Sequence, residues 1–152
     1  LAAADIQAVL HQHRHSWTFS HYSKHYHGAQ AFTVELGRAL PFRQNDLAPL
    51  APMAALLAAL LQGREPPAAP PERMAFFRVE QELMREAEAF HLAFPEATPN
   101  FTEFPPGTLL AEDGRAGETR VGATPLAVVF PNAAVEIGAR AALLVRPEPP
   151  PA

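Results

Sequence analysis

A proline-rich segment limits what this chain can fold into. Four prolines lie among the seven residues Glu65–Pro71. Because proline lacks an amide hydrogen and holds φ near about −65°, such a run forms a stiff spacer rather than a helix or an inner strand. We therefore predict a linker at 64–72 between a first domain part at 1–63 and a second domain at 73–146. The tail at 147–152 has the same composition and is predicted to be disordered.

Composition and charge exclude several kinds of partner. The 152 residues are 48% hydrophobic, which is enough to bury a core. The net charge of −4 does not suggest a nucleic-acid partner, and no apolar run approaches the roughly 20 residues that span a membrane. The absence of cysteine excludes disulfides and thiolate metal ligands. We expect a cytoplasmic protein that binds neither nucleic acid nor membrane, and the sequence leaves its oligomeric state open.

The second domain has the pattern of a small β-rich barrel or sandwich. Short apolar runs alternate with glycine and proline turn signals. The predicted strands are 74–80, 108–112, 118–121, 126–130 and 140–145. One segment conflicts with this pattern, because residues 79–91 have high helix propensity and helical spacing of their apolar side chains.

The first part mixes helical and strand patterns, which indicates an α/β fold. We expect a helix at 4–13, then a polar loop at 13–28 with a short strand near 17–19. A second helix is predicted at 53–61, after the capping residues Asn45 and Asp46.

The segment 30–36 reads as a short buried strand that carries one carboxylate. Phe32, Val34 and Leu36 alternate on one face, and Glu35 lies on the other. A carboxylate on an apolar strand is costly to bury without a partner. Glu35 is therefore either a general base at the edge of a site or one half of a structural ion pair, with Arg38, Arg43 or a histidine as its partner.

Six histidines lie between His11 and His27. The spacing of His21, His25 and His27 allows two imidazoles on one side of the chain, which is a pattern that metal ions use. The more plausible interpretation is a polar lining for a site that binds an anionic substrate. Arg140 is a further candidate for gripping a substrate carboxylate, because its guanidinium matches the shape of that group.

Several phrases of the sequence resemble one enzyme family. They are FTVELG (32–37), PFRQNDL (41–47), FFRVEQELMREAEAF (76–90), NFTEFPPGTLLAEDG (100–114) and VVFPNAAVEIGARAALL (128–144). In this order and spacing they are similar to the C-terminal part of the succinylglutamate desuccinylase/aspartoacylase family of zinc aminoacylases. The resemblance covers nearly all of the chain outside the proline-rich linker and tail.

The resemblance implies the end of a zinc-carboxypeptidase-like α/β catalytic domain, followed by a small β-rich domain. It implies hydrolysis of N-succinyl-L-glutamate to succinate and L-glutamate in arginine catabolism, with one zinc ion as cofactor. The glutamate of the family's phrase is the general base and falls on Glu35. The resemblance also implies that 76–94 is a long β-segment, against its helix propensity.

Family members bind zinc through a His-x-x-Glu pair and a later histidine, and no His-x-x-Glu occurs in this sequence. Because the chain also begins at Leu1 rather than Met, we expect a piece of a longer polypeptide, inactive alone, whose metal ligands lie in a preceding part. No metal ligand is assigned in this chain.

Glu35 is accordingly predicted to be catalytic, and His25, His27 and Arg140 to bind substrate. The segment 130–140 is expected to lie nearest the mouth of the site. Two alternatives remain. One is a related zinc hydrolase that acts on another N-acyl amino acid or as a carboxypeptidase. The other is a non-enzymatic, histidine-rich module that binds metal or protein.

Overall fold

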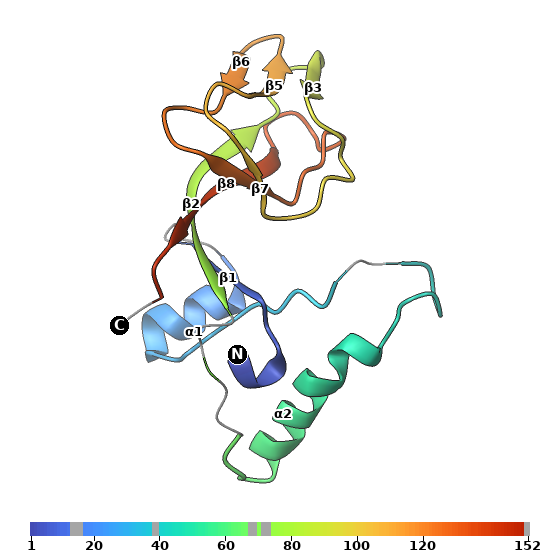
Figure 1. The fold of residues 1–152 in the computed structure, drawn as a ribbon, viewed down its shortest axis with the longest axis vertical. Coiled ribbons are helices and arrows are strands. Elements are labelled where there is room, and N and C mark those ends of the chain that lie inside the picture. Colours follow the sequence, from blue (N-terminus) through green and yellow to red (C-terminus); the bar gives the residue numbers. More distant parts are fainter. Residues whose placement is uncertain (13–16, 38–39, 67–69, 71–73, 151–152) are drawn as a thin grey trace. The chain divides into compact units, whose positions relative to one another are not determined.

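A computed structural model describes residues 1–12, 17–37, 40–66, 70 and 74–150. The chain divides into two compact units (Figure 1). The first consists of Leu1–Gln7 and His13–Met74, and the second of Ala8–Gln12 and Ala75–Ala152. Unlike the predicted division, a short N-terminal stretch belongs to the second unit. The linker at 64–72 stays a prediction, because 67–69 and 71–72 lie outside the described residues.

The second unit contains two sheets. The larger has the strand order β1-β2-β8-β7-β4. Its strands are β1 (Ala8–His11), β2 (Ala75–Met84), β8 (Arg140–Glu148), β7 (Leu126–Val129) and β4 (Thr102–Phe104). Only the pairing of β1 with β2 is parallel. The smaller sheet has the order β3-β5-β6 and is formed by β3 (Phe90–Leu92), β5 (Leu109–Asp113) and β6 (Gly117–Arg120).

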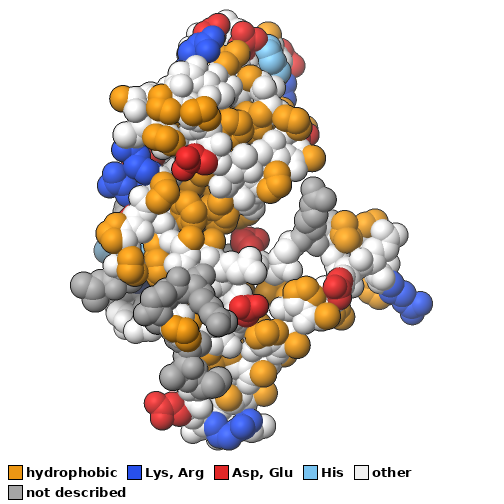
Figure 2. Space-filling model, viewed as in Figure 1, with side chains coloured by type: hydrophobic (Ala, Val, Ile, Leu, Met, Phe, Trp, Pro, Cys, Tyr) orange, Lys and Arg blue, Asp and Glu red, His pale blue; other side chains and the backbone are white. Residues whose placement is uncertain are grey.

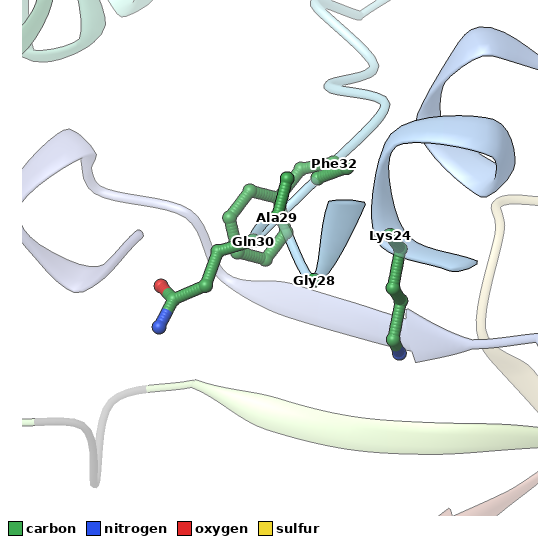
Figure 3. Close-up of a pocket in the computed structure, with 6 residues that line it drawn as sticks. Lys24, Gly28, Ala29, Gln30 and Phe32 are labelled. Carbon is green, nitrogen blue, oxygen red and sulfur yellow. The ribbon is translucent and has the colours of Figure 1, made fainter. Parts of the chain in front are cut away.

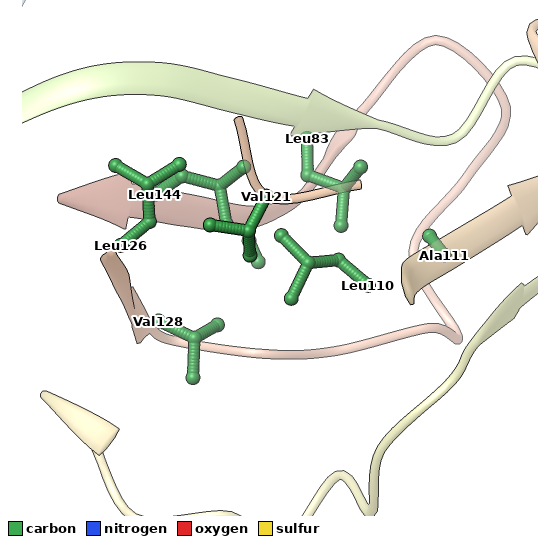
Figure 4. Close-up of a cluster of buried hydrophobic side chains, with 8 residues drawn as sticks. Leu83, Leu110, Ala111, Val121, Leu126, Val128 and Leu144 are labelled. Atoms are coloured by element: carbon green, nitrogen blue, oxygen red, sulfur yellow. The ribbon is translucent and has the colours of Figure 1, made fainter. Parts of the chain in front are cut away.

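Strands β7 and β8 form the centre of the second unit because they bury side chains on both faces. Alternate residues feed two apolar clusters. The first comprises Leu83, Leu110, Ala111, Val121, Leu126, Val128, Ala142 and Leu144 (Figure 4). The second comprises Ala127, Val129, Leu143 and Val145. Apolar runs without polar alternation are expected of strands covered on both sides.

The five strands predicted from turn signals are confirmed, each within a few residues of its predicted bounds. The prediction that 76–94 is a β-segment is also confirmed where β2 and β3 form. The helix that local propensity favours at 79–91 is not present, so that prediction is wrong. Pairing of β2 with β1 on one side and β8 on the other outweighs the local helix propensity.

The predicted disordered tail needs a correction, since β8 continues through Pro147 and Glu148. Both residues pair with β2, and the Glu148 carboxylate is hydrogen-bonded to the His11 imidazole. Strand β7 pairs with β8 only as far as Val145, so the missing N–H of Pro147 removes no bond to β7.

Asp113, at the end of β5, is buried and holds three chain segments together. Its Oδ2 accepts hydrogen bonds from the backbone N–H groups of Glu86 (2.8 Å) and Ala87 (3.1 Å). Its Oδ1 accepts from Arg115 (2.8 Å) and Ala116 (3.0 Å). The Ala116 N–H does most to lower the pKa of Asp113 to about 2, and burial acts in the opposite direction.

Replacing Asp113 by asparagine is expected to destabilise the second unit. The amide NH₂ of asparagine cannot accept the two hydrogen bonds that Oδ2 accepts from the backbone N–H groups. We therefore expect the Tm to fall by roughly 5–10 °C at neutral pH. Because the pKa is lowered on folding, the carboxylate's contribution is full above about pH 4 and is lost as the pH falls through about 2.

Thermal unfolding of D113N between pH 2 and 7 tests this expectation. The difference in Tm from the parent should shrink as the pH falls below 4. The exposed Glu118, which pairs with Arg120 at 2.8 Å, gives the matched control E118Q. A parent and a D113N variant with the same Tm at pH 7 would refute the structural role of Asp113.

Among its described residues, the first unit contains two α-helices and two 3₁₀ turns. These are η1 (Ala2–Ala4), α1 (Phe19–His27), η2 (Ala48–Leu50) and α2 (Ala51–Leu61). The predicted helix at 53–61 is confirmed and begins two residues earlier, with Pro52 tolerated in its first turn. Asp46 Oδ1 accepts a hydrogen bond from the Ala48 N–H at 3.0 Å, at the start of the η2 turn that leads into α2.

The predicted helix at 4–13 and the predicted strand near 17–19 are both wrong. The helix at 4–13 is replaced by η1 and β1, with Asp5 at φ 57° between them, because β1 pairs with β2 far along the chain. The strand near 17–19 is instead the start of α1, where the Thr18 hydroxyl accepts a hydrogen bond from the His21 N–H at 3.3 Å. Among the described residues, no helix is long and apolar enough to cross a bilayer.

Candidate functional site

The segment 30–36 forms neither helix nor strand in the structure, and Glu35 is exposed. The prediction of a buried strand is therefore wrong for this chain by itself. A strand has no internal hydrogen bonds, so it needs a neighbour to pair with. Among the described residues, no other segment pairs with 30–36 as a strand.

The alternative role for Glu35, a structural ion pair, finds no support in the described part of the chain. Within those ranges no Lys, Arg or His lies in salt-bridge distance of its carboxylate. Arg38 lies outside the described residues. The guanidinium of Arg43 lies 5.7 Å from the centroid of the Phe42 ring. The catalytic role of Glu35 stays a prediction.

Helix α1 carries the predicted substrate-binding histidines. Thr18 caps its first turn, and Gly28, at φ 61°, ends it with an N–H that donates to the Lys24 carbonyl at 3.1 Å. Lys24, His25 and His27 occupy the last turn, where the negative end of the helix dipole favours positive charge.

Several rings of α1 contact one another along the helix. The His21 and His25 rings stack with their centroids 5.6 Å apart, and the His25 ring meets the Tyr26 ring edge-on at 4.7 Å. Tyr22 contacts His27 at 5.3 Å between centroids. His25 and His27 are both exposed and lie at the C-terminal end of α1, upstream of Glu35 in the same unit.

An open hollow of about 390 Å³ lies where α1 ends. It is lined by Lys24, Gly28, Ala29, Gln30, Ala31 and Phe32, and Figure 3 shows the polar ends of Lys24 and Gln30 beside it. None of the predicted site residues lines it. Lys24 and Gln30 were not singled out from the sequence, although Lys24 is the only lysine of the chain.

Arg140 is the first residue of β8 and belongs to the second unit. Its Nη1 lies 3.6 Å from Oε1 of the half-buried Glu82, and this ion pair is also consistent with a purely structural role for Arg140. Its role in binding substrate stays a prediction, and so does the placement of 130–140 at the mouth of the site.

The loop before Arg140 is held firmly in one conformation. Phe130 adopts φ 56°, which is rare for a bulky side chain, and its N–H donates to Asn100 Oδ1 at 2.8 Å. The Ala133 N–H donates to Glu96 Oε1 at 2.7 Å, and Arg85 Nη1 donates to the Val135 carbonyl at 2.8 Å. These hydrogen bonds connect the loop to other segments of the second unit.

A metal site is not formed by the residues that the structure describes. Over those ranges, no three His, Asp or Glu side chains come together in a way that could hold a metal ion. The described residues thus do not fit a zinc centre. The expectation that the ligands lie in a preceding part stays a prediction.

Comparison with known proteins defines the class. Residues 1–61 match the model of the succinylglutamate desuccinylase/aspartoacylase catalytic domain, and residues 72–148 match that of the AstE/AspA barrel-sandwich hybrid domain. Together with the helices and sheets described above, these matches confirm the predicted fold class, which is the C-terminal part of an α/β catalytic domain followed by a small barrel-sandwich domain. The chain belongs to the succinylglutamate desuccinylase/aspartoacylase family.

Individual relatives agree with this assignment. The chain is 41% identical to succinylglutamate desuccinylase of Ectopseudomonas mendocina over 97% of its own length and 44% of that enzyme's. The succinylglutamate desuccinylase of Erwinia tasmaniensis is also 41% identical, over 95% and 44%. The crystal structure of the Vibrio cholerae enzyme superposes with a TM-score of 0.85 at 33% identity, covering 96% of this chain and 42% of that one. The chain therefore spans less than half the length of these relatives.

Proposed function

We propose that this chain is part of a zinc-dependent amidohydrolase that cleaves N-succinyl-L-glutamate to succinate and L-glutamate. The observation that carries the proposal is the match of both family domains, in order, together with 41% identity to a succinylglutamate desuccinylase over nearly the whole chain. We place the reaction in arginine catabolism and in the cytoplasm, as the resemblance implies.

Glu35 is proposed as the general base. Its carboxylate takes a proton from the attacking water as the oxygen adds to the amide carbonyl carbon. The same proton then passes to the leaving nitrogen as the C–N bond breaks, so that succinate and glutamate are released. Glu35 is exposed and has no salt-bridge partner among the described residues. Its carboxylate is therefore available for proton transfer.

The substrate carries carboxylates on both its succinyl and its glutamate halves, so cationic and hydrogen-bonding side chains suit it. Support for a role of α1 comes from its last turn, where Lys24, His25 and His27 gather at one end of the helix. Arg140 is proposed to bind a substrate carboxylate through its guanidinium. Zinc is proposed to be held by residues other than those described, and we expect the 152-residue chain alone to be inactive.

The family also contains aspartoacylases, and this favours one second candidate, a zinc hydrolase for other N-acyl amino acids. The test is a substrate panel with the complete polypeptide, meaning residues 1–152 with all the sequence that accompanies them in the natural protein. We expect the highest kcat/KM for N-succinyl-L-glutamate. A higher value for an N-acyl-aspartate or for a peptide carboxylate would replace the proposed substrate.

Arg140→Ala is expected to raise KM for N-succinyl-L-glutamate about 10-fold or more in the complete polypeptide, with a smaller effect on kcat. The reason is the loss of a charged hydrogen bond to a substrate carboxylate. Initial-rate kinetics provide the measurement. Arg120 is similarly exposed and paired with a glutamate, so R120A is the matched control. An unchanged KM in R140A would remove Arg140 from the site.

A further inference from the structure

The side chain of Arg85 is largely buried in the second unit, although it carries a permanent charge. It follows directly after β2, and only 18% of its side chain is exposed. Among the described residues its carboxylate partner is Glu88, with 3.4 Å between Nη2 and Oε2, and the Glu88 side chain is 89% exposed. Because one partner lies in water, this ion pair contributes little to stability. The burial of the Arg85 guanidinium therefore has another cause.

The remaining donors of Arg85 bind backbone carbonyl groups. Nη1 donates to the Val135 carbonyl at 2.8 Å and to the Ala133 carbonyl at 3.5 Å, and Nε donates to the Ala87 carbonyl at 3.3 Å. The planar guanidinium presents its N–H groups in fixed directions, which a lysine ammonium does not. The side chain of Arg85 thus connects the end of β2 to the loop 133–139, which precedes Arg140.

The backbone of Arg85 contacts the far end of the same loop. Its N–H donates to the Ala139 carbonyl at 3.0 Å, and its carbonyl accepts from the Gly138 N–H at 2.7 Å. Gly138 adopts φ 84°, a conformation that other residues rarely take. Both bonds lie directly before Arg140, where the pairing of β2 with β8 becomes irregular. Arg85 therefore holds the middle of the loop through its side chain and the end through its backbone.

The distribution of charge makes the position of a single arginine important for an anionic substrate. The chain carries 12 Lys and Arg against 16 Asp and Glu. On the face that Figure 2 presents, Lys and Arg side chains form small separate groups in blue, with hydrophobic and uncharged surface between them. General attraction to a basic surface is therefore weak, and binding of carboxylates depends on where individual guanidinium groups are held.

We propose that Arg85 is a positioning residue of the hydrolase. It fixes the loop 133–139 and thereby places the Arg140 guanidinium against a substrate carboxylate, and it does not itself touch the substrate. The inference rests on the proposed function, because Arg140 binds substrate only under that proposal. Arg85 was not among the residues singled out from the sequence.

Amide hydrogen exchange in the complete polypeptide tests the effect on the loop without using activity. In Arg85→Ala, the amides of Gly138 and Ala139 should exchange at least about 10-fold faster than in the parent, because the side chain no longer holds the loop carbonyls. R115A removes an exposed guanidinium from the same unit and is the matched control, with a change of less than about twofold. Unchanged exchange at Gly138 and Ala139 in R85A would overturn the proposal.

The amides of β7 and β8 show whether the second unit stays folded, and they should remain within about twofold of the parent in R85A. If they exchange faster as well, Arg85→Lys takes the place of R85A in both tests, with the same expectations. Lysine keeps the charge and most of the apolar stem but cannot reproduce the set of carbonyl contacts.

A kinetic double-mutant cycle tests whether Arg85 acts through Arg140. R85A should raise KM about 3–10-fold and change kcat by less than about threefold, as expected when substrate binding is lost through misplacement of a contacting group. In R85A/R140A, KM should stay within about twofold of the value for R140A, because the group that Arg85 positions is then absent. An unchanged KM in R85A, or effects of the two substitutions that multiply, would overturn the proposal.

The outcomes separate this inference from the proposed function, because the cycle is measured with the substrate that ranks first in the panel. If another N-acyl amino acid ranks first and Arg85 remains coupled to Arg140 for that substrate, the positioning role stands and the proposed substrate is overturned. If N-succinyl-L-glutamate ranks first and the two substitutions act independently, the proposed substrate stands and the positioning role is overturned.

Discussion

Replacing Glu35 by glutamine is expected to lower kcat for N-succinyl-L-glutamate by roughly 10²–10⁴-fold in the complete polypeptide. Glutamine keeps the size and hydrogen-bonding shape of the side chain but cannot take a proton from water, and this range is typical for loss of one acid–base group. KM should change little, because the lost interaction belongs to the transition state rather than to substrate binding.

The control for this prediction is another exposed acid of the same unit. Glu65 is the exposed first residue of the proline-rich segment, and E65Q should keep full activity. Zinc content, measured in both variants, should equal that of the parent. If E35Q retains its zinc and its full kcat, Glu35 is not the base.

The second large effect concerns stability. Leu110 in β5 is fully buried in the cluster between the two sheets (Figure 4). Leu110→Ala removes buried methyl groups and leaves a cavity, which costs about 2–5 kcal/mol of unfolding free energy. Urea unfolding followed through the exchange of β5, β7 and β8 amides measures this cost in the second unit.

The matched control for L110A is Ile137→Ala, a truncation of a half-exposed side chain in the same unit. Its cost should stay within about 0.5–1 kcal/mol. Equal losses in L110A and I137A would show that the apolar cluster around Leu110 is not the core of the second unit.

The second unit could largely be predicted from the sequence because its signals are local. Glycine and proline turns bracket five strands, and apolar runs such as Leu126–Val129 show strands buried on both faces. Two features needed long-range information. Strand β1 pairs with β2 although more than sixty residues separate them in the sequence. The β2 segment has high helix propensity and forms a strand because it pairs with β1 and β8.

The candidate site was harder to predict because its parts depend on a surrounding domain. The alternation of Phe32, Val34 and Leu36 has strand character, but a pattern does not supply the neighbour that a strand requires. The histidines were predicted in a loop, whereas Thr18 and Gly28 cap a helix around them. The role of Glu35 rests on the family resemblance, and those of His25, His27 and Arg140 rest on the chemistry of their side chains; all four remain predictions.

One measurement tests the central claim, that this chain supplies the general base of a desuccinylase but not its metal site. Succinate release from N-succinyl-L-glutamate and bound zinc are measured side by side in the complete polypeptide and in residues 1–152 alone. We predict succinate release and one tightly bound zinc in the complete polypeptide, and neither in the chain alone. Stoichiometric zinc binding by the chain alone, lost on changing His25 and His27, would contradict the account and favour a metal-binding module instead.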